Sequence, residues 1–256
     1  MTIQWNFEFQ YWIITMRQLH LSLNYIWVIA MELKLISLLV ISGITFSACD
    51  SAIQKAPAPS IDTIESIQPI VGASHFINGY APKVDNDIQV VIEIPTGTTA
   101  KWEVDKSDGL LHWQIKNGNP RIVEYLGYPG NYGMIPRTLL AKDSGGDGDP
   151  LDVIVLGPPV DRGSVVKAKL IGVLKLLDGG EQDDKLIAVL EDTSFYFLNS
   201  INDLDENFSG VSLILSTWFE SYKGPGEMQA KGFGEITEAE AILDTAILAF
   251  ESSSNE

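Results

Sequence analysis

Residues 145–157 read GGDGDPLDVIVLG, a glycine-rich turn that runs directly into an apolar strand. The turn places three carboxylates within six residues, those of Asp147, Asp149 and Asp152. Carboxylates packed this closely repel one another unless a cation lies among them. Asp152 opens the strand itself, where a charged side chain without a partner is costly. The stretch therefore favours a metal-binding turn at the entrance of a core strand.

Two other interpretations of this turn stay open. An ordinary surface turn rich in Asp and Gly would explain Asp147, but it gives no reason for Asp152 at a strand entrance. A calcium-binding loop is the second, yet DSGGDGDPLD (143–152) lacks the glutamate that an EF-hand carries at its twelfth position. We favour the metal site over both.

The composition limits the partners and the metals. The chain has 256 residues and a formal net charge of −17. This length suffices for one core, and this charge disfavours nucleic acid, whose binding needs a basic face. There is one cysteine, Cys49, and three scattered histidines, His20, His75 and His112, so a zinc site built on Cys and His is disfavoured. A metal here would be held by carboxylates, which suits Mg²⁺, Mn²⁺ or Ca²⁺.

Around the turn, short strands separated by Gly, Pro and Asp precede two helices. Strands are expected at 88–95, 101–105, 110–116, 121–126, 151–157, 164–177 and 186–190. Apolar residues at spacings of three and four predict helices over 209–223 and 237–251, and Thr237 with Glu240 predicts a capping box at the start of the second. The pattern predicts an α+β fold: a small OB-like closed or partly open antiparallel β-barrel with two C-terminal helices packed against it.

Charged and phenolic side chains gather at three further places. DGGEQDDK (178–185) follows the long strand, although such a segment alone is more often a solvated hairpin turn. Glu93 ends one strand, and KWEVD (101–105) alternates charged and apolar residues on the next. Tyr222 and Lys223 end a helix, where a core tyrosine and a C-terminal lysine are also common without any function. Together the clusters imply many carboxylates for metals and a few cations for an anion.

The combination resembles family I inorganic pyrophosphatases over roughly residues 84–252. The diagnostic pattern of that family is Asp-x-Asp-Pro-x-Asp, and residues 147–152 read DGDPLD. Further segments agree with the family in order and approximate spacing, and these are VVIEIP (90–95), KWEVD (101–105), YPGNYG (128–133), VLKLLDGGEQDDKLIAV (173–189) and FESYK (219–223).

The resemblance implies hydrolysis of pyrophosphate to two phosphates, with several Mg²⁺ ions per site, Mn²⁺ as a possible substitute, and a homo-oligomeric enzyme. Asp149 would accept a proton from the attacking water or orient it. The metal-binding residues that the resemblance implies are Asp147, Asp152, Asp178, Asp183 and Glu93. The substrate-binding residues that it implies are Lys101, Glu103, Arg121, Tyr132, Lys185, Tyr222 and Lys223.

Two positions depart from the family pattern. The interval between Asp105 and Tyr128 is longer than in compact bacterial members, and Arg121 is its only arginine. Gly179 stands where some relatives carry a further acid. Two other functions stay open: a non-catalytic metal-binding lipoprotein on the same scaffold, and a hydrolase of another phosphoanhydride such as a nucleotide or a short polyphosphate.

The first eighty residues predict export and a tether. Residues 31–48 carry a charged start, an apolar run and small residues, which is the plan of a signal peptide, and Cys49 then resembles the lipidated cysteine of a bacterial lipoprotein. Residues 1–30 fit no such plan and are interpreted as an over-extended N-terminus. Residues 49–80 are interpreted as a tether and 81–252 as the pyrophosphatase domain. We expect an exported lipoprotein, anchored to the membrane with its domain outside the cytosol. The alternatives are a plain signal peptide, a single membrane anchor, and a cytoplasmic enzyme.

Overall fold

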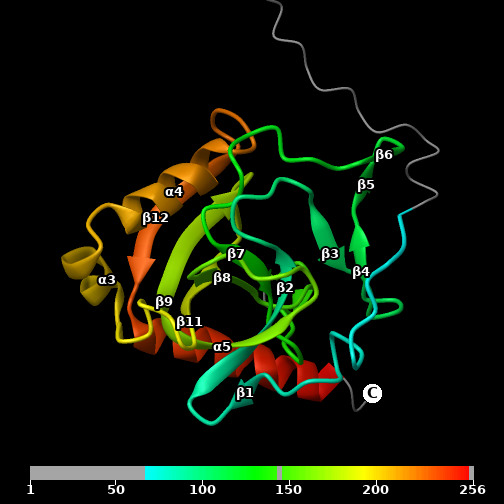
Figure 1. Cartoon of the computed structure of the whole chain (residues 1–256), viewed down its shortest axis with the longest axis horizontal. Coiled ribbons are helices and arrows are strands. Elements are labelled where there is room, and N and C mark those ends of the chain that lie inside the picture. The colour runs from blue at the N-terminus through cyan, green and yellow to red at the C-terminus, as the bar shows by residue number, and fades with distance from the viewer. Residues whose placement is uncertain (1–66, 143–145, 254–256) are drawn as a thin grey trace, which may run out of the picture. The chain divides into compact units, whose positions relative to one another are not determined.

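The computed structural model describes residues 67–142 and 146–253 of the chain. The predictions for residues 1–30, for the signal peptide at 31–48 and for Cys49 lie outside the described residues. Within the described ranges no helix combines the length and the apolar character needed to cross a membrane. The described residues form a ring of strands with helices packed against it (Figure 1).

Five strands close the ring, because each pairs with the next and the last pairs with the first. In ring order they are β2 (Asp87–Ile94), β7 (Asn131–Met134), β8 (Asp152–Leu156), β11 (Lys185–Leu190) and β9 (Val165–Asp178). The pairing of β9 with β2 completes the circuit. All of these pairs are antiparallel except β8 with β11, which is parallel. The ring is therefore built on a mixed sheet.

Shorter elements extend the ring and cover it. β1 (Lys83–Val84) pairs with β2, while β10 (Glu181–Gln182) and β12 (Met228–Gly234) pair with β9. Two hairpins form separate small sheets, β3 (Trp102–Val104) with β4 (Leu111–Trp113) and β5 (Ile115–Lys116) with β6 (Asn119–Pro120). The helices of the described residues are α3 (Ile201–Asn207), α4 (Val211–Ser221) and α5 (Ile236–Ser253).

Alternation along the ring strands produces two buried clusters on opposite strand faces. On β8, Ile154 and Leu156 join the cluster that includes residues of α3 and α4, and Val153 and Val155 join the cluster that includes residues of α5. In Figure 1, α4 lies beside β12 and α5 runs across the end of the ring. A slip of one residue in register would therefore move the side chains of a strand from one cluster into the other and disrupt the packing of both. Charged residues at the strand ends are thereby held in fixed positions.

The predicted α+β fold, with a ring of strands and two C-terminal helices, is confirmed with two differences. The expected sheet was wholly antiparallel, but β8 and β11 are parallel, because β9 forms a hairpin with β11 and returns it beside β8. The third helix, α3, was not predicted, since seven residues give too short a pattern to recognise.

Three local elements differ from what the sequence predicted. The strand expected over 121–126 is wrong: Ile122 makes only an isolated bridge to Ala100, and Leu126 is largely exposed. The strand β7 begins inside YPGNYG, where the sequence predicted no strand. The helix α5 begins at Ile236, with Glu235 O accepting its first backbone hydrogen bonds. Thr237 therefore lies inside the first turn, so it is not the predicted cap.

The described part of the expected tether packs against the domain. Ile70 exchanges two backbone hydrogen bonds with Leu111, at 2.8 and 3.1 Å. Phe76 is fully buried in a cluster with Val91 and Leu111, and Ile67 packs against that cluster. The packed chain therefore already includes Ile67, fourteen residues before the predicted boundary at residue 81.

Candidate active site

A cavity of about 830 Å³ opens where β2, β7, β8 and β11 meet the β3–β4 hairpin and the end of α4. Every residue that the sequence predicted for the site lines this one cavity. They are Glu93, Lys101, Glu103, Arg121, Tyr132, Asp147, Asp149, Asp152, Asp178, Asp183, Lys185, Tyr222 and Lys223. Their individual roles stay predictions, while their convergence is a property of the fold.

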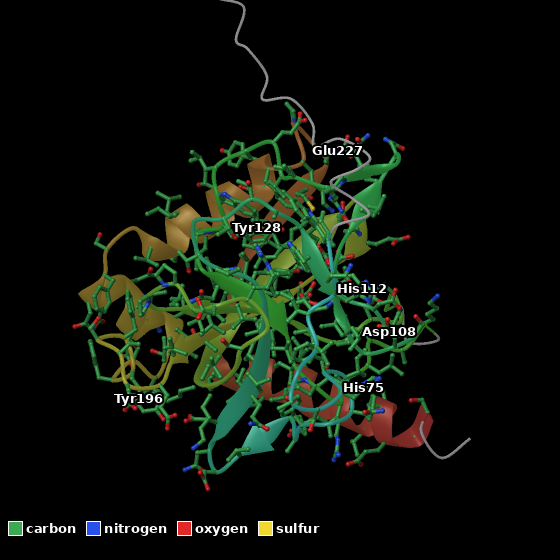
Figure 2. The ribbon with its side chains drawn as sticks, turned by 45° about the vertical axis from the view of Figure 1, so that its right-hand side comes forward. His75, Asp108, His112, Tyr128, Tyr196 and Glu227 are labelled. Atoms are coloured by element: carbon green, nitrogen blue, oxygen red, sulfur yellow. The ribbon has the colours of Figure 1, made fainter. Side chains whose placement is uncertain are left out.

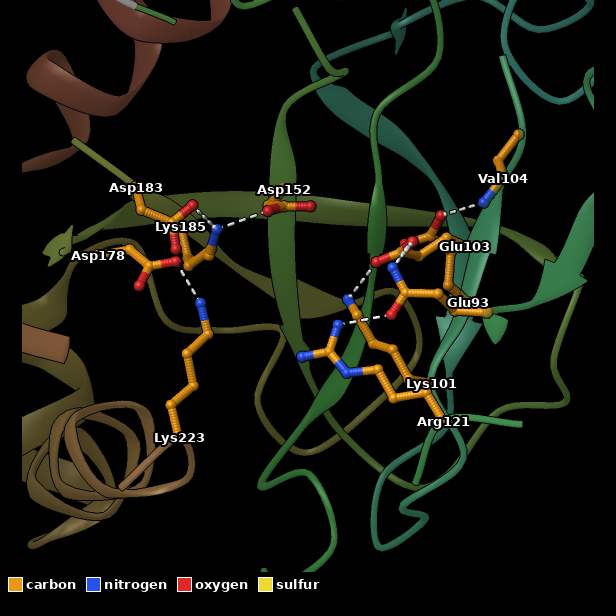
Figure 3. Close-up of polar contacts among 11 residues, drawn as sticks. Glu93, Lys101, Glu103, Val104, Arg121, Asp152, Asp178, Asp183, Lys185 and Lys223 are labelled. Carbon is orange, nitrogen blue, oxygen red and sulfur yellow. Dashed lines mark hydrogen bonds and ion pairs between the residues drawn. The ribbon is translucent and has the colours of Figure 1, made fainter. Parts of the chain in front are cut away.

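Lys185 and two aspartates form the centre of the cavity (Figure 3). Lys185 opens β11 and Asp152 opens the parallel neighbour β8, so their side chains start at the same edge of the sheet. The Lys185 ammonium lies 2.5 Å from Asp152 Oδ2 and 2.6 Å from Asp183 Oδ1. Lys185 is only 4% exposed, and breaking such a buried pair would leave an uncompensated charge.

Burial and this lysine act on the two aspartates in opposite directions. Burial alone would raise the pKa of Asp152, but Lys185 and Lys101 outweigh it and the pKa is lowered. For Asp183, burial outweighs Lys185 and the pKa is raised. Of the two aspartates, Asp152 is thus held more firmly in its charged form.

Glu93 and Lys101 line the cavity beside this centre. Glu93 lies near the end of β2, is 5% exposed, and accepts a 2.8 Å hydrogen bond at Oε1 from the Val104 amide. Burial raises the pKa of Glu93 to about 8, with Lys101 opposing the shift. The Lys101 ammonium lies 3.0 Å from Glu103 Oε1 and 5.1 Å from the centre of the Tyr132 ring.

Arg121 reaches the cavity through a chain of hydrogen bonds. Its guanidinium donates to Gln114 Oε1 at 2.5 Å, and Gln114 Nε2 donates to Glu103 Oε2 at 2.6 Å. The Arg121 carbonyl accepts from the Lys101 amide at 3.0 Å. Sequence reasoning missed Gln114, because an uncharged residue between two short strands carries no recognisable signal for a role between two charged ones.

Two lysines on turns pair with the outer carboxylates. Lys223, just beyond α4, pairs with Asp178 at the end of β9, as Figure 3 shows. Lys106, in the turn between β3 and β4, pairs with Asp149 and also donates to the Gly148 carbonyl at 3.0 Å. Sequence reasoning missed Lys106, although it directly follows KWEVD.

Two tyrosines complete the lining. Tyr132 lies on β7, and burial raises its pKa well above the usual value. Burial likewise raises the pKa of Tyr222, whose ring stacks on Trp218 at 4.7 Å. Both phenols therefore keep their protons at neutral pH and can donate hydrogen bonds to an anion.

A comparison with known proteins assigns the chain to a family. The family model for inorganic pyrophosphatase matches residues 90–251. The chain belongs to the inorganic pyrophosphatase family. The Halalkalibacterium halodurans inorganic pyrophosphatase is 40% identical over 165 residues, covering 63% of this chain and 91% of that protein. Inorganic pyrophosphatase 1 of Caenorhabditis elegans is 33% identical over 227 residues, covering 79% of this chain, which spans only 53% of that protein.

Solved pyrophosphatase structures share the fold. The Helicobacter pylori inorganic pyrophosphatase matches with a TM-score of 0.58 and 34% identity, covering 67% of this chain and 98% of that one. A truncated vacuolar soluble pyrophosphatase of Trypanosoma cruzi in complex with PPi matches with a TM-score of 0.66 and 26% identity, covering 73% and 80% of the two chains.

The donor chemistry of the cavity fits divalent metal ions of the kind this family uses. Eight carboxylates and five lysine or arginine side chains line the cavity, so negative charge is in excess. All candidate donors are carboxylate oxygens, which suit a hard cation such as Mg²⁺. Among residues 67–142 and 146–253, however, no three His, Cys, Asp or Glu side chains converge as a ready metal site. Lysine ammoniums lie against the carboxylates instead, at the places to which a cation is attracted.

Proposed function

We propose that this chain hydrolyses inorganic pyrophosphate to two phosphates in the presence of Mg²⁺. One observation carries the proposal: all the residues predicted from the family resemblance line a single cavity, and four ion pairs join members of this set. Membership of the inorganic pyrophosphatase family supports the same reaction.

The charge of the cavity supports a need for metal. Pyrophosphate is itself a dense anion, and a cavity with more carboxylates than basic groups would repel it. Divalent cations bound between the carboxylates and the phosphates remove this repulsion. The residues that would hold them are Asp147, Asp152, Asp178, Asp183 and Glu93. When bound, such ions make a water molecule more acidic and neutralise phosphate oxygens.

The basic side chains divide between two sides of the cavity. Lys101 and Arg121 lie together near Glu103, whereas Lys223 lies near Asp178 on the other side, where Lys185 lies beside Asp183 (Figure 3). In this proposal they bind phosphate oxygens on both halves of the substrate and stabilise charge on the leaving phosphate. The phenols of Tyr132 and Tyr222 donate further hydrogen bonds.

Asp149 takes the role of the proton acceptor. Its side chain is about half exposed, so it can reach a water molecule in the cavity. Its backbone amide donates a 2.8 Å hydrogen bond to Asp147 Oδ1, which fixes the turn that carries it. A carboxylate held this way takes the proton of the attacking water without forming a covalent bond to phosphate.

Phosphate release from three substrates tests the function. We expect rapid release from pyrophosphate with Mg²⁺, none with a chelator, and recovery when Mg²⁺ is restored. Nucleoside triphosphate and tripolyphosphate, assayed side by side, should release far less. Faster release from either one would favour a hydrolase of another phosphoanhydride. No release from any substrate would favour a non-catalytic metal-binding protein.

We further propose that the enzyme is an exported lipoprotein, anchored through Cys49, and that it forms a homo-oligomer. The plan of residues 31–48 and the position of the only cysteine support the anchor. Labelling of whole cells with a palmitate probe should mark the wild type but not Cys49→Ser, and protease should reach the domain from outside. An unlabelled wild-type protein in the cytosolic fraction would contradict the anchor. Light scattering of the isolated domain tests the oligomer.

A further inference from the structure

Lys106 is a cavity-lining cation that the family resemblance did not assign. It lies in the turn between β3 and β4, while its partners lie in the DGDPLD turn more than forty residues away. The ammonium contacts both the Asp149 carboxylate and the Gly148 carbonyl, at 3.0 Å for the carbonyl. Two oxygens of one turn thus converge on one positive charge.

The turn that carries Lys106 is rigid. Asp105 Oδ1 accepts from both the amide and the hydroxyl of Ser107, at 2.8 and 2.6 Å. The Gly109 amide donates to the Asp105 carbonyl at 2.8 Å, and a Cβ added at Gly109, where φ is +67°, would come within 2.0 Å of the His75 ring. The turn is therefore closed by its own hydrogen bonds and pressed against His75.

Figure 2 shows His75, Asp108 and His112 around this same turn. His112 Nε2 lies 2.9 Å from Asp108 Oδ2, which ties the turn to β4. A rigid base with a flexible four-carbon stem can aim an ammonium at the DGDPLD turn and still let it swing.

Lys106 is also the most exposed of the paired lysines in the cavity. Its side chain is 54% exposed, against 13% for Lys101, 5% for Lys185 and 26% for Lys223. The buried lysines are fixed by their surroundings, whereas Lys106 can leave Asp149 at small cost, because exposed ion pairs are weak.

We propose that Lys106 is an internal counter-ion of the DGDPLD turn. Its ammonium competes with a divalent metal ion for that turn, and it contacts a substrate phosphate instead once the metal is bound. The inference rests on the proposed function, since it assigns a metal and a phosphate to this cavity. Lys106 is a positioning residue in the metal-free enzyme and a phosphate ligand in the loaded one.

Binding of Mg²⁺ alone, measured by calorimetry without any phosphate, tests the first half. Lys106→Met keeps the apolar stem and removes the charge. It should bind Mg²⁺ about two- to fivefold more tightly than the wild type. The variant lacks a competing cation, and that cation's interaction with the turn has only the strength of an exposed ion pair. Lys106→Arg should bind as the wild type does. Lys116→Met removes an exposed lysine that does not line the cavity and should change nothing.

A double-mutant cycle excludes a merely structural role. In an Asp149→Asn background, Lys106→Met should no longer tighten Mg²⁺ binding, because its partner carboxylate is already neutral. The competition is overturned if Lys106→Met leaves the Mg²⁺ affinity unchanged or weakens it. It is equally overturned if the tightening persists in the Asp149→Asn background.

Steady-state kinetics at saturating Mg²⁺ test the second half. Lys106→Met should raise KM for pyrophosphate by about three- to tenfold, since it removes a phosphate contact. An unchanged KM would overturn the phosphate contact. The metal titration does not depend on turnover, so its outcome stays separate from a failure of the proposed function, which an inactive wild type would reveal.

Discussion

The cavity has two kinds of lining that differ in burial. The strand wall comprises Glu93, Asp152 and Lys185 at or near the ends of ring strands, with Lys101 directly before β3; Glu93 and Lys185 are 5% and 4% exposed. The loop rim comprises Lys106, Asp149 and Lys223 on turns, together with Asp178 at the last position of β9, and Lys106 and Asp149 are 54% and 53% exposed. Both linings pair lysines with carboxylates. They differ in how much these ion pairs contribute to the stability of the fold.

The difference is energetic. A buried ion pair cannot lose one member without leaving a charge in a poorly solvated place, so the strand wall serves both stability and function. An exposed pair contributes at most about 1 kcal/mol to stability, so the loop rim can be altered with little effect on folding. Substitutions in the two linings should therefore separate activity from stability.

The largest effect on turnover is expected at the rim. Asp149→Asn should lower kcat by about 10²- to 10⁴-fold, because the group proposed to accept the proton is lost. The thermal unfolding midpoint should stay nearly unchanged, since the pair with Lys106 is exposed. Stopped-time phosphate assays and thermal unfolding measure the two quantities. Turnover within tenfold of the wild type would remove Asp149 from this role.

The largest effect on stability is expected at the wall. Lys185→Met should lower the free energy of unfolding by about 3 kcal/mol, because Asp152 and Asp183 lose the ammonium between them. Urea unfolding in the presence of a chelator measures this, and Lys185→Arg, which keeps the charge, is the control. A loss below about 1 kcal/mol would show that the wall is no more costly to alter than the rim.

The sequence predicted the charged members of both linings except Lys106, because short motifs with fixed spacing carry them. DGDPLD supplies both Asp149 of the rim and Asp152 of the wall, and the apolar strand after it showed where Asp152 would lie. The long strand β9 and the helices α4 and α5 were also predicted, since their periodicity extends over more than ten residues.

The remaining features depend on contacts between distant segments. Gln114 acts between Glu103 and Arg121, and Lys106 reaches across to Asp149, but neither pairing follows from spacing along the chain. The parallel pairing of β8 with β11 is likewise decided by how β9 turns back. Segment 121–126 has strand-like residues but no neighbouring strand to pair with, so its pattern gave a wrong prediction.

A pH-dependent effect of intermediate size is expected at the wall. The pKa of Glu93 is raised from 4.5 to about 8 in the folded protein. Its contribution to stability is therefore complete below about pH 4.5 and is lost as the pH rises through about 8. In the metal-free protein Glu93→Gln should remove most of this decline, because the neutral amide does not titrate. Urea unfolding at several pH values measures it, and an unchanged pH dependence in the variant would contradict the buried, proton-binding state of Glu93.

The smallest effect is expected for the second rim lysine. Lys223→Met should raise KM for pyrophosphate by about three- to tenfold, because one phosphate contact is lost while Asp149 and the wall stay in place. The unfolding free energy should change by less than about 1 kcal/mol, because Lys223 and Asp178 are both partly exposed. Lys116 is exposed on β5 and does not line the cavity, so Lys116→Met removes the same charge and should leave both quantities unchanged. A large loss of stability in Lys223→Met would mean that its pair with Asp178 belongs to the strand wall. The two linings would then differ by burial rather than by position on a strand or a turn.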